Sequence, residues 1–156
     1  MDVLILCGST SDLPVLQETK KVLESFSVSY ELHVASAHRT PERVERLVAQ
    51  AEAAGAKVII CAAGMAAHLA GAVAARTVLP VVGVPLASGT LGGFDSLLST
   101  VQMPPGIPVA TVAVGKPGAM NGAFLALEIL ALSDSAVREK LLEWRKKKAA
   151  EIEESG

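Results

Sequence analysis

The stretch DVLILCGSTSDLPVLQETKKVLESF, residues 2–26, contains the pattern that decides the fold. Its first six residues are mostly apolar and β-forming, which predicts a buried strand over 2–7. Small polar residues follow, and apolar residues then recur at helical spacing, which predicts a helix over 12–26. A strand with a continuous apolar run that leads directly into a helix is typical of a parallel sheet covered by helices.

The alternation of strand and helix continues to the end of the chain. Further strands are predicted over 29–35, 57–63, 80–85 and 108–114, and further helices over 41–55, 66–76, 118–132 and 133–155. Regular alternation with short connections predicts an α/β fold, a three-layer αβα sandwich with a doubly wound parallel sheet. We expect one domain over residues 1–156, which ends in a C-terminal helix at about 133–155.

The segment from Thr77 to Gly115 is less regular, because it has one charged residue, Asp95, and many Gly, Ser and Pro. We interpret it as a strand, a long functional or interface loop, a short helix and another strand. Asp95 precedes the apolar run SLLSTVQM and is interpreted as the N-cap of that short helix.

Composition limits the possible partners and location of the protein. The formal net charge is −2, which gives no reason to expect a nucleic acid or a membrane as partner. Charged residues make up only 19%, so part of the surface is expected to face another subunit. No secretory leader or membrane-spanning run is visible, and Cys7 and Cys61 are interpreted as inert core thiols, so a reduced, cytoplasmic setting is expected. The three histidines are dispersed, which predicts no metal site.

The loop CGSTSDLP, residues 7–14, lies beyond the carboxyl end of the first strand, where ligands bind in a doubly wound sheet. The hydroxyls of Ser9 and Ser11 and the free N–H groups of the following helix form an arrangement that can hold a phosphate. The alternative is an ordinary helix cap at Ser11 or Asp12, and the two interpretations are equally supported. Since Asp12 would repel a phosphate, we expect it to accept hydrogen bonds from sugar hydroxyls.

The loop SAHRTP, residues 36–41, follows the second strand. Thr40 and Pro41 are typical of a helix start. Arg39 at a helix start opposes the helix dipole unless an anion lies between them, and a phosphate would bind both. His38 can give or take a proton near neutral pH. A surface His and Arg in a polar turn is the alternative, but the set together with Ser36 favours a functional site.

The loop AAGMAAHLAG, residues 62–71, follows the third strand and is rich in small apolar side chains. Gly64 provides the turn, and His68 lies near the start of the next helix. His68 is either a satisfied buried histidine or part of an apolar, dry pocket wall.

The chain resembles a known family through motifs that occur in the family's order, namely GSTSD, SAHRTP, AAHL, DSLLSTVQMP and NGAFLALEIL. The resemblance extends from Val3 to about Trp144 and is to the N5-carboxyaminoimidazole ribonucleotide mutases, the bacterial class I enzymes of purine biosynthesis. It implies a flavodoxin-like fold, a homo-octamer, a ribonucleotide substrate, and no metal or organic cofactor. It also implies functional coupling to an upstream ATP-dependent carboxylating enzyme.

The resemblance assigns roles to residues by motif. Ser9 and Arg39 would hold the 5′-phosphate, Asp12 the ribose hydroxyls, and His38 would be the general acid and base. The remaining substrate-binding positions implied by the motifs are Ser11, Ser36, Gly64, His68 and Leu69. Within the third loop, Met65 replaces a glycine of the family motif and Ala70 a proline, and Ala63 stands at the strand exit where the family usually has glycine.

The family chemistry gives these loops a common purpose. A carboxylate moves from an exocyclic nitrogen to carbon 4 of an aminoimidazole ring, by loss of CO2 and its recapture at carbon. One imidazole can serve both proton transfers, and an apolar wall that includes Ala66 and Ala67 would keep CO2 in and water out. Three alternatives remain: a direct CO2-dependent carboxylase, a divergent carboxylase acting on another aromatic nucleotide, and a non-catalytic nucleotide-binding module.

Overall fold

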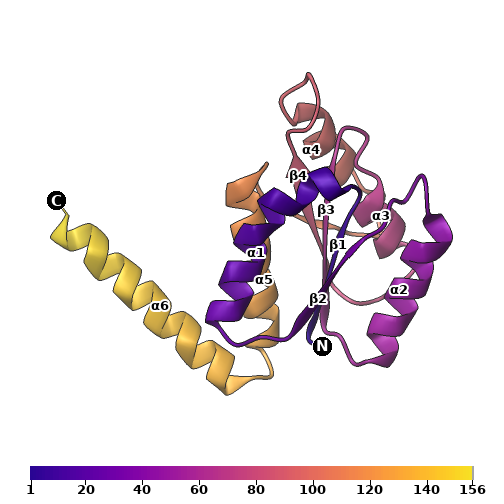
Figure 1. Ribbon diagram of the computed structural model, residues 1–156. Helices are drawn as coiled ribbons and strands as arrows, with labels where there is room; N and C mark the ends of the chain where they lie inside the picture. The colour runs from indigo at the N-terminus through magenta and orange to yellow at the C-terminus, as the bar shows by residue number, and fades with distance from the viewer. Residues whose placement is uncertain (156) are drawn as a thin grey trace.

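The computed structural model describes residues 1–155 and contains a five-stranded parallel sheet with strand order β2-β1-β3-β4-β5 (Figure 1). The strands are β1 Val3–Cys7, β2 Tyr30–Val34, β3 Val58–Gly64, β4 Val81–Leu86 and β5 Ala110–Thr111. The helices are η1 Thr10–Asp12, α1 Leu13–Ser25, α2 Pro41–Ala53, α3 Leu69–Ala74, α4 Phe94–Val101, α5 Lys116–Leu130 and α6 Ser135–Glu154. This strand order is that of the flavodoxin-like doubly wound fold, so the predicted fold class is confirmed.

Two layers of helices cover the sheet because successive strand residues face opposite sides. Ile5 and Ile60 point into a core formed with α1 and α5, and Leu4 and Ile59 into a core formed with α2 and α3. On the first side, the buried Thr19 hydroxyl donates a hydrogen bond to the Ala119 carbonyl at 2.8 Å and joins α1 to α5. The carboxyl ends of the strands lie together at the top of the sheet, opposite the N-terminus (Figure 1).

The last strand is shorter than the expected 108–114, and Pro85 explains why. The Gly83 carbonyl accepts a hydrogen bond from the Val112 N–H at 3.0 Å, and the Pro85 carbonyl accepts one from the Gly115 N–H at 2.8 Å. Gly83 and Pro85 therefore both face β5, but proline has no N–H to donate. The regular ladder stops after Thr111.

The third helix is also shorter than the expected 66–76. The chain turns sharply after β3, with Met65 at a φ of 55° and the His68 N–H bonded to the Ala66 carbonyl at 2.8 Å. The helix therefore begins only at Leu69 and ends at Ala74. Similarly, the start of the expected helix 12–26 belongs to η1, and α1 proper begins at Leu13.

Asp95 is not the N-cap of α4, contrary to the expectation. Gly93 occupies the N-cap with a φ of 90°, a left-handed conformation that favours glycine. The Asp95 side chain lies in the first helical turn, and its Oδ1 is buried without a hydrogen-bond partner among residues 1–155. The side chain that forms hydrogen bonds at the start of α4 is instead the buried Ser96 hydroxyl, which lies 2.8 Å from the Leu86 carbonyl and 3.0 Å from the Gly93 carbonyl.

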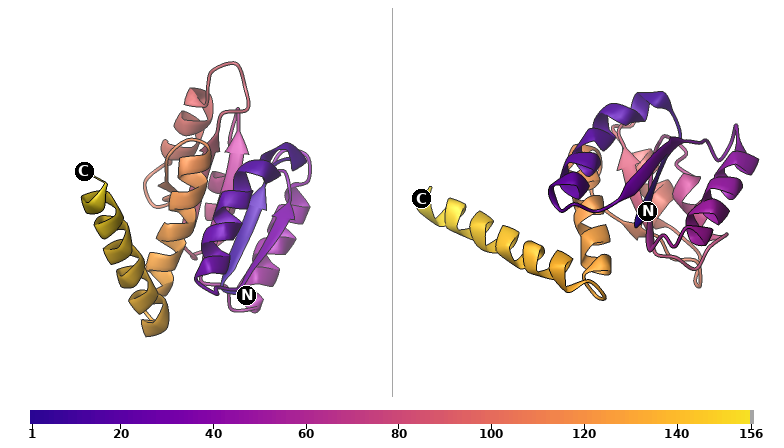
Figure 2. Two further views of the ribbon diagram at one scale, coloured as in Figure 1. Left: turned by 60° about the vertical axis from the view of Figure 1, so that its left-hand side comes forward. Right: turned by 60° about the horizontal axis from the view of Figure 1, so that its bottom comes forward.

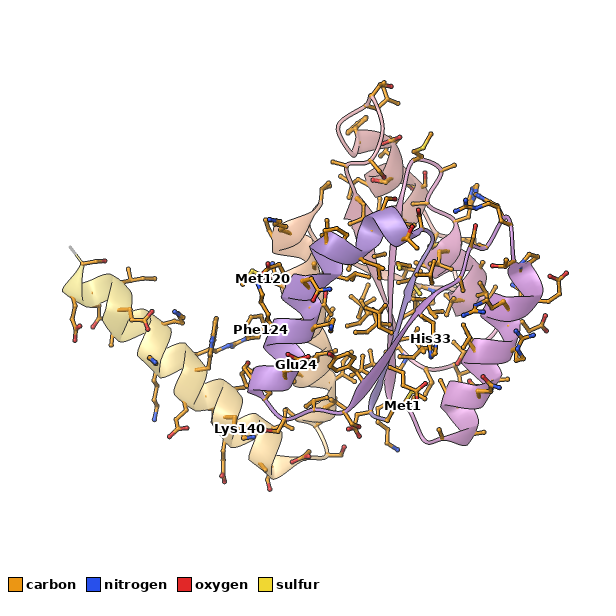
Figure 3. All side chains as sticks on the ribbon, viewed as in Figure 1. Met1, Glu24, His33, Met120, Phe124 and Lys140 are labelled. Carbon is orange, nitrogen blue, oxygen red and sulfur yellow. The ribbon has the colours of Figure 1, made fainter. Side chains whose placement is uncertain are left out.

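The C-terminal helix α6 extends away from the sheet (Figure 2). It is held at its base, where Val137 and Leu141 are buried and the Lys140 ammonium donates to the Phe26 carbonyl at 3.0 Å. Trp144 packs on Phe124 of α5 with ring centroids 4.4 Å apart, and Phe124 and Lys140 lie on this side of the molecule (Figure 3). Over residues 1–155, none of the helices combines the length and hydropathy that a membrane crossing requires.

Candidate active site

A cavity of about 520 Å³ lies at the carboxyl ends of β1, β2, β3 and β4. It contains all nine site residues expected from the sequence, Ser9, Ser11, Asp12, Ser36, His38, Arg39, Gly64, His68 and Leu69. It is completed by Gly8, Ala37, Ala63, Met65, Ala66 and Ser88. Ligands bind at this edge of doubly wound sheets. The three loops predicted to form a site therefore do line a single cavity.

The loop after β1 forms a capping box on η1. The Ser9 hydroxyl accepts a hydrogen bond from the Ser11 N–H at 3.3 Å, and Asp12 Oδ2 accepts one from the Ser9 N–H at 2.9 Å. An ordinary cap is therefore present, but the capping residue is Ser9 rather than Ser11 or Asp12. Since all three side chains also line the cavity, the capping role and a ligand-binding role are compatible.

Asp12 is a buried acid in this capping box, only 5% exposed. Burial raises the pKa of its carboxyl, and hydrogen bonds from Ser9, Ser11 and Gly8 together with the charge of Arg39 partly oppose this. A carboxyl whose pKa is raised by burial, in a cavity at the strand ends, is a candidate for a functional role.

Arg39 bridges the ends of β1 and β2. Its Nη2 donates to the Gly8 carbonyl at 2.8 Å, and its Nε lies 3.4 Å from the Ser36 hydroxyl, which also accepts from the Arg39 backbone N–H at 3.2 Å. Thr40 is the N-cap of α2 and Pro41 its first residue, as expected, although the Thr40 hydroxyl bonds to the Ser36 backbone rather than capping the helix. The guanidinium is held over the cavity with donors left for an anion.

His38 and His68 form a direct hydrogen bond that the sequence did not reveal. His38 Nε2 lies 2.6 Å from His68 Nδ1, and the two rings meet edge to face with centroids 4.9 Å apart. Since a nitrogen-to-nitrogen hydrogen bond uses one proton, the two facing nitrogens share a single proton between them. Among residues 1–155, no third His, Cys, Asp or Glu joins them to form a metal-binding group.

The loop after β3 forms the apolar wall of the cavity. Ala63, Gly64, Met65 and Ala66 line it, whereas Ala67 is 2% exposed and lies outside the lining. Met65 adopts the left-handed conformation in which glycine is most easily accommodated, at the position where the family motif has glycine. The chain thus keeps the turn and places an additional apolar side chain, 60% exposed, at the mouth of the cavity.

A second cavity of about 510 Å³ adjoins the first and shares Gly8, Ser9, Ser36 and Arg39 with it. It adds Arg43 on α2, which the sequence analysis did not single out. Ser88, after β4, was also missed, because its loop ASGTLGG contains no titratable or cationic residue. The only available signal was its position after the fourth strand.

The two cysteines are buried in the strands β1 and β3 and are not bonded to each other. Burial raises the pKa of Cys7 to about 11 and also raises the pKa of Cys61. Both thiols thus lie in the core as expected, and their raised pKa values favour the protonated form.

The fold and the cavity define an α/β protein of flavodoxin-like topology with a polar, phosphate-compatible site at the strand ends. Residues 2–151 match the family described as AIR carboxylase, and the chain belongs to that family. It is 57% identical over 141 residues to an N5-carboxyaminoimidazole ribonucleotide mutase of Pyrococcus abyssi, covering 90% of this chain and 80% of that protein. It is 47% identical over 153 residues to the mutase of that name from Escherichia coli K12, covering 98% of this chain and 90% of that protein.

The fold also matches a solved structure. The crystal structure of Treponema denticola PurE superimposes with a TM-score of 0.89 at 29% identity, covering 97% of this chain and 94% of that one. The similarity therefore includes α6, because the match extends over nearly the whole chain.

Proposed function

We propose that this chain is an N5-carboxyaminoimidazole ribonucleotide mutase, an isomerase that makes 4-carboxy-5-aminoimidazole ribonucleotide for purine biosynthesis. The observation that carries the proposal is the His38–His68 pair in the cavity whose other side is closed by Arg39. A proton-transferring group and an anion-binding group within one cavity are what a phosphorylated, proton-exchanging substrate requires. Relatives of that name at 47–57% identity support it.

Binding begins at the phosphate. Arg39, with the Ser9 hydroxyl beside it, takes the 5′-phosphate, and Asp12 accepts hydrogen bonds from the ribose hydroxyls. Ser11 and Ser36 line the path between these two groups. The aminoimidazole ring then extends toward His38 and the loop after β3, formed here by Gly64, His68 and Leu69. Binding energy at the phosphate, remote from the reacting atoms, orients the ring.

His38 acts as general acid and then as general base. When the bond between the exocyclic nitrogen and the carboxylate breaks, CO2 leaves, and the electron pair on nitrogen takes a proton from His38. Carbon 4 then attacks CO2 and loses its own proton, which returns to His38. The reaction is balanced, because one proton is given and one is recovered. His68, hydrogen-bonded to His38 at 2.6 Å, sets the orientation and tautomer of the ring that exchanges it.

The apolar wall retains CO2 between the two steps. Ala63, Ala66 and Met65 offer no group that hydrates CO2 or attracts water, so the released molecule stays beside carbon 4. Ala66 lines the cavity and Ala67 does not, so the test belongs at Ala66. Replacing Ala66 with Ser should increase CO2 escape per turnover, and an unchanged rate of escape would contradict this role.

Assembly and setting complete the proposal. A homo-octamer of single-domain chains accounts for the apolar side chains exposed on α4, Phe94, Leu98 and Val101, because another copy would cover them. The enzyme acts in the cytoplasm, without a metal or organic cofactor, downstream of an ATP-dependent enzyme that makes the N-carboxylated substrate.

Two substrates separate this proposal from a direct carboxylase. Purified protein is given either the N-carboxylated ribonucleotide or the bare aminoimidazole ribonucleotide with bicarbonate. Efficient turnover of the first supports the mutase, and efficient turnover of only the second would make the chain a direct carboxylase. A nucleotide-binding module would convert neither.

A further inference from the structure

We propose that Ser88 is a substrate-binding residue that donates a hydrogen bond to the migrating carboxylate and to the CO2 formed from it. This inference rests on the proposed function and adds a polar contact to a part of the cavity that is otherwise an apolar wall. Ser88 lies in the loop after β4 and lines the same cavity as His38, His68 and Arg39.

The hydroxyl of Ser88 lies directly over the backbone at the exit of β3. A Cβ added to Gly64 would collide with the Ser88 hydroxyl and come within 2.8 Å of the Ser88 Cβ. Glycine at position 64 is therefore required by this close approach, whereas the left-handed turn that follows is made by Met65 rather than by Gly64 as expected. Because Gly64 begins the apolar wall, the Ser88 hydroxyl is brought to the side of the cavity where CO2 is retained.

The position of Ser88 is fixed by the sheet. Leu86 pairs with Gly64 in the β3–β4 register, two residues before Ser88. The Leu86 carbonyl is within 2.8 Å of the buried Ser96 hydroxyl, which joins the end of β4 to α4. On its other side, Gly89 faces the Met65 side chain, since an added Cβ there would lie 3.3 Å from Met65 Cγ. Contacts before and after Ser88 thus hold the loop against the cavity.

The Ser88 hydroxyl has both its donor and its acceptor free for a ligand, whereas the other serine hydroxyls of the cavity each take part in a hydrogen bond within the site. Ser9 and Ser11 bond to each other at 2.9 Å, and Ser36 accepts from the Arg39 backbone. Ser88 makes no hydrogen bond to any group of residues 1–155 and lines the cavity through an exposed side chain. A hydroxyl suits this role, because it donates to a carboxylate or to neutral CO2 without a charge of its own.

The chemistry of the substrate places its carboxylate at this end. With the phosphate on Arg39, between the ends of β1 and β2, the ring extends across His38 toward β3 and β4. The lining at that side is Ala63, Gly64, Met65 and Ala66, none of which has a polar side chain. Ser88 is the only side-chain hydrogen-bond donor that the β4 loop adds to the cavity lining of the described chain.

The test compares two ligands that differ only in the carboxylate. The dissociation constants of the C4-carboxylated product and of the bare aminoimidazole ribonucleotide are measured for wild type, Ser88→Ala and Thr90→Ala. Thr90→Ala is the matched control, because it removes a hydroxyl from the same loop at a position outside the cavity lining. For Ser88→Ala we expect carboxylated product to bind about tenfold more weakly, as for a lost hydrogen bond to a charged group, with the bare ribonucleotide unchanged.

The outcomes separate this inference from the proposed function. Equal weakening of both ligands by Ser88→Ala, or of neither, overturns the role of Ser88 while leaving the mutase intact. Failure of the wild type to bind either ribonucleotide overturns the function itself and with it the role of Ser88. Thermal unfolding of each variant checks that the loop change leaves the fold in place.

Discussion

His38 and His68 show what individual residues contribute and what sequence reasoning could not provide. Both were identified as site residues, but they are 30 positions apart and follow β2 and β3, which lie on either side of β1 in the sheet. Their pairing depends on the strand order and on the turn at Met65, and the local sequence predicts neither of these. Ser88 was missed for a related reason, because a lone serine in a loop has no pattern to distinguish it.

The clearest residue-level prediction concerns His38. Replacing His38 with Asn should lower kcat by roughly 10²–10⁴-fold, as for loss of a general acid–base, while the affinity for the ribonucleotide changes little. Steady-state kinetics and calorimetric binding measure the two effects. The matched control is His33→Asn, because His33 pairs with Glu31 at 3.0 Å on β2 and lies outside the cavity lining. Retained turnover in His38→Asn would show that His38 is not the general acid–base, whereas absence of turnover in the wild type as well would support a nucleotide-binding module.

Asp12 offers a prediction about stability and pH. Its folded-state pKa is raised above the ordinary 3.8, so the native state holds this proton more tightly than the unfolded state does. The stabilisation that the protonated Asp12 carboxyl gives the folded protein is therefore complete below pH 3.8. It is lost as pH rises through the folded-state pKa of Asp12. As pH rises through that pKa, the free energy of unfolding of Asp12→Asn, which cannot ionise, should increase relative to that of the wild type. The kcat/KM of the same variant should fall by about tenfold or more, because the contact with the ribose is lost.

Urea unfolding at one fixed protein concentration measures the Asp12 effect across pH. The values below pH 3.8, where the wild-type carboxyl is protonated, supply the baseline for each protein. A stability difference that stays flat or reverses as pH rises would contradict the burial argument. A fully active Asp12→Asn variant would remove Asp12 from the substrate site.

At the scale of secondary structure, the elements that could be predicted are those whose signal is local. Strands β1, β3 and β4 are buried apolar runs, and each lies within a residue or two of its expected bounds. The elements that differ are governed by contacts between segments. Pro85 of a neighbouring strand shortens β5, and Gly93 rather than Asp95 starts α4, because the backbone there is left-handed.

Gly83 provides the test at this scale, because it lets α4 and β5 approach β4. A Cβ at Gly83 would collide with Thr100 Cγ2 of α4 and come within 2.8 Å of Val109 Cγ1. Gly83→Ala should therefore destabilise the protein by about 1–3 kcal/mol, as overpacking does. Chemical denaturation measures it, and Gly106→Ala is not a suitable control because its φ is 94°.

A better control for Gly83 is Gly8→Ala at the β1 exit, where an added Cβ meets only Asp12 Oδ2 at 3.9 Å. It should leave the free energy of unfolding nearly unchanged. The double variant Gly83→Ala with Thr100→Ser, which removes the colliding methyl group, should recover part of the loss. A stable Gly83→Ala variant would mean that α4 packs less tightly on β4 than described.

At the scale of the whole molecule, α6 extends away from the sheet and α4 carries exposed apolar side chains. The sequence predicted α6 closely, because charge and helical spacing define it, but not its direction away from the sheet (Figure 2). The low charge content led us to expect a surface that faces another subunit, and exposed apolar side chains are found on α4 at Phe94, Leu98 and Val101. The proposed homo-octamer would cover that surface, and contacts between subunits leave no periodic signal in a single sequence.

In the proposed reaction the carboxylate moves within the cavity from nitrogen to carbon, and one labelling measurement tests this most directly. Substrate with a ¹³C-labelled N-carboxylate is converted in a large pool of unlabelled bicarbonate, and the label in the C4 carboxylate of the product is measured by mass spectrometry. The cavity with its apolar wall predicts that most product molecules retain the label. Product that carries the unlabelled carboxylate of the pool would contradict the account and identify a carboxylase that takes CO2 from solution.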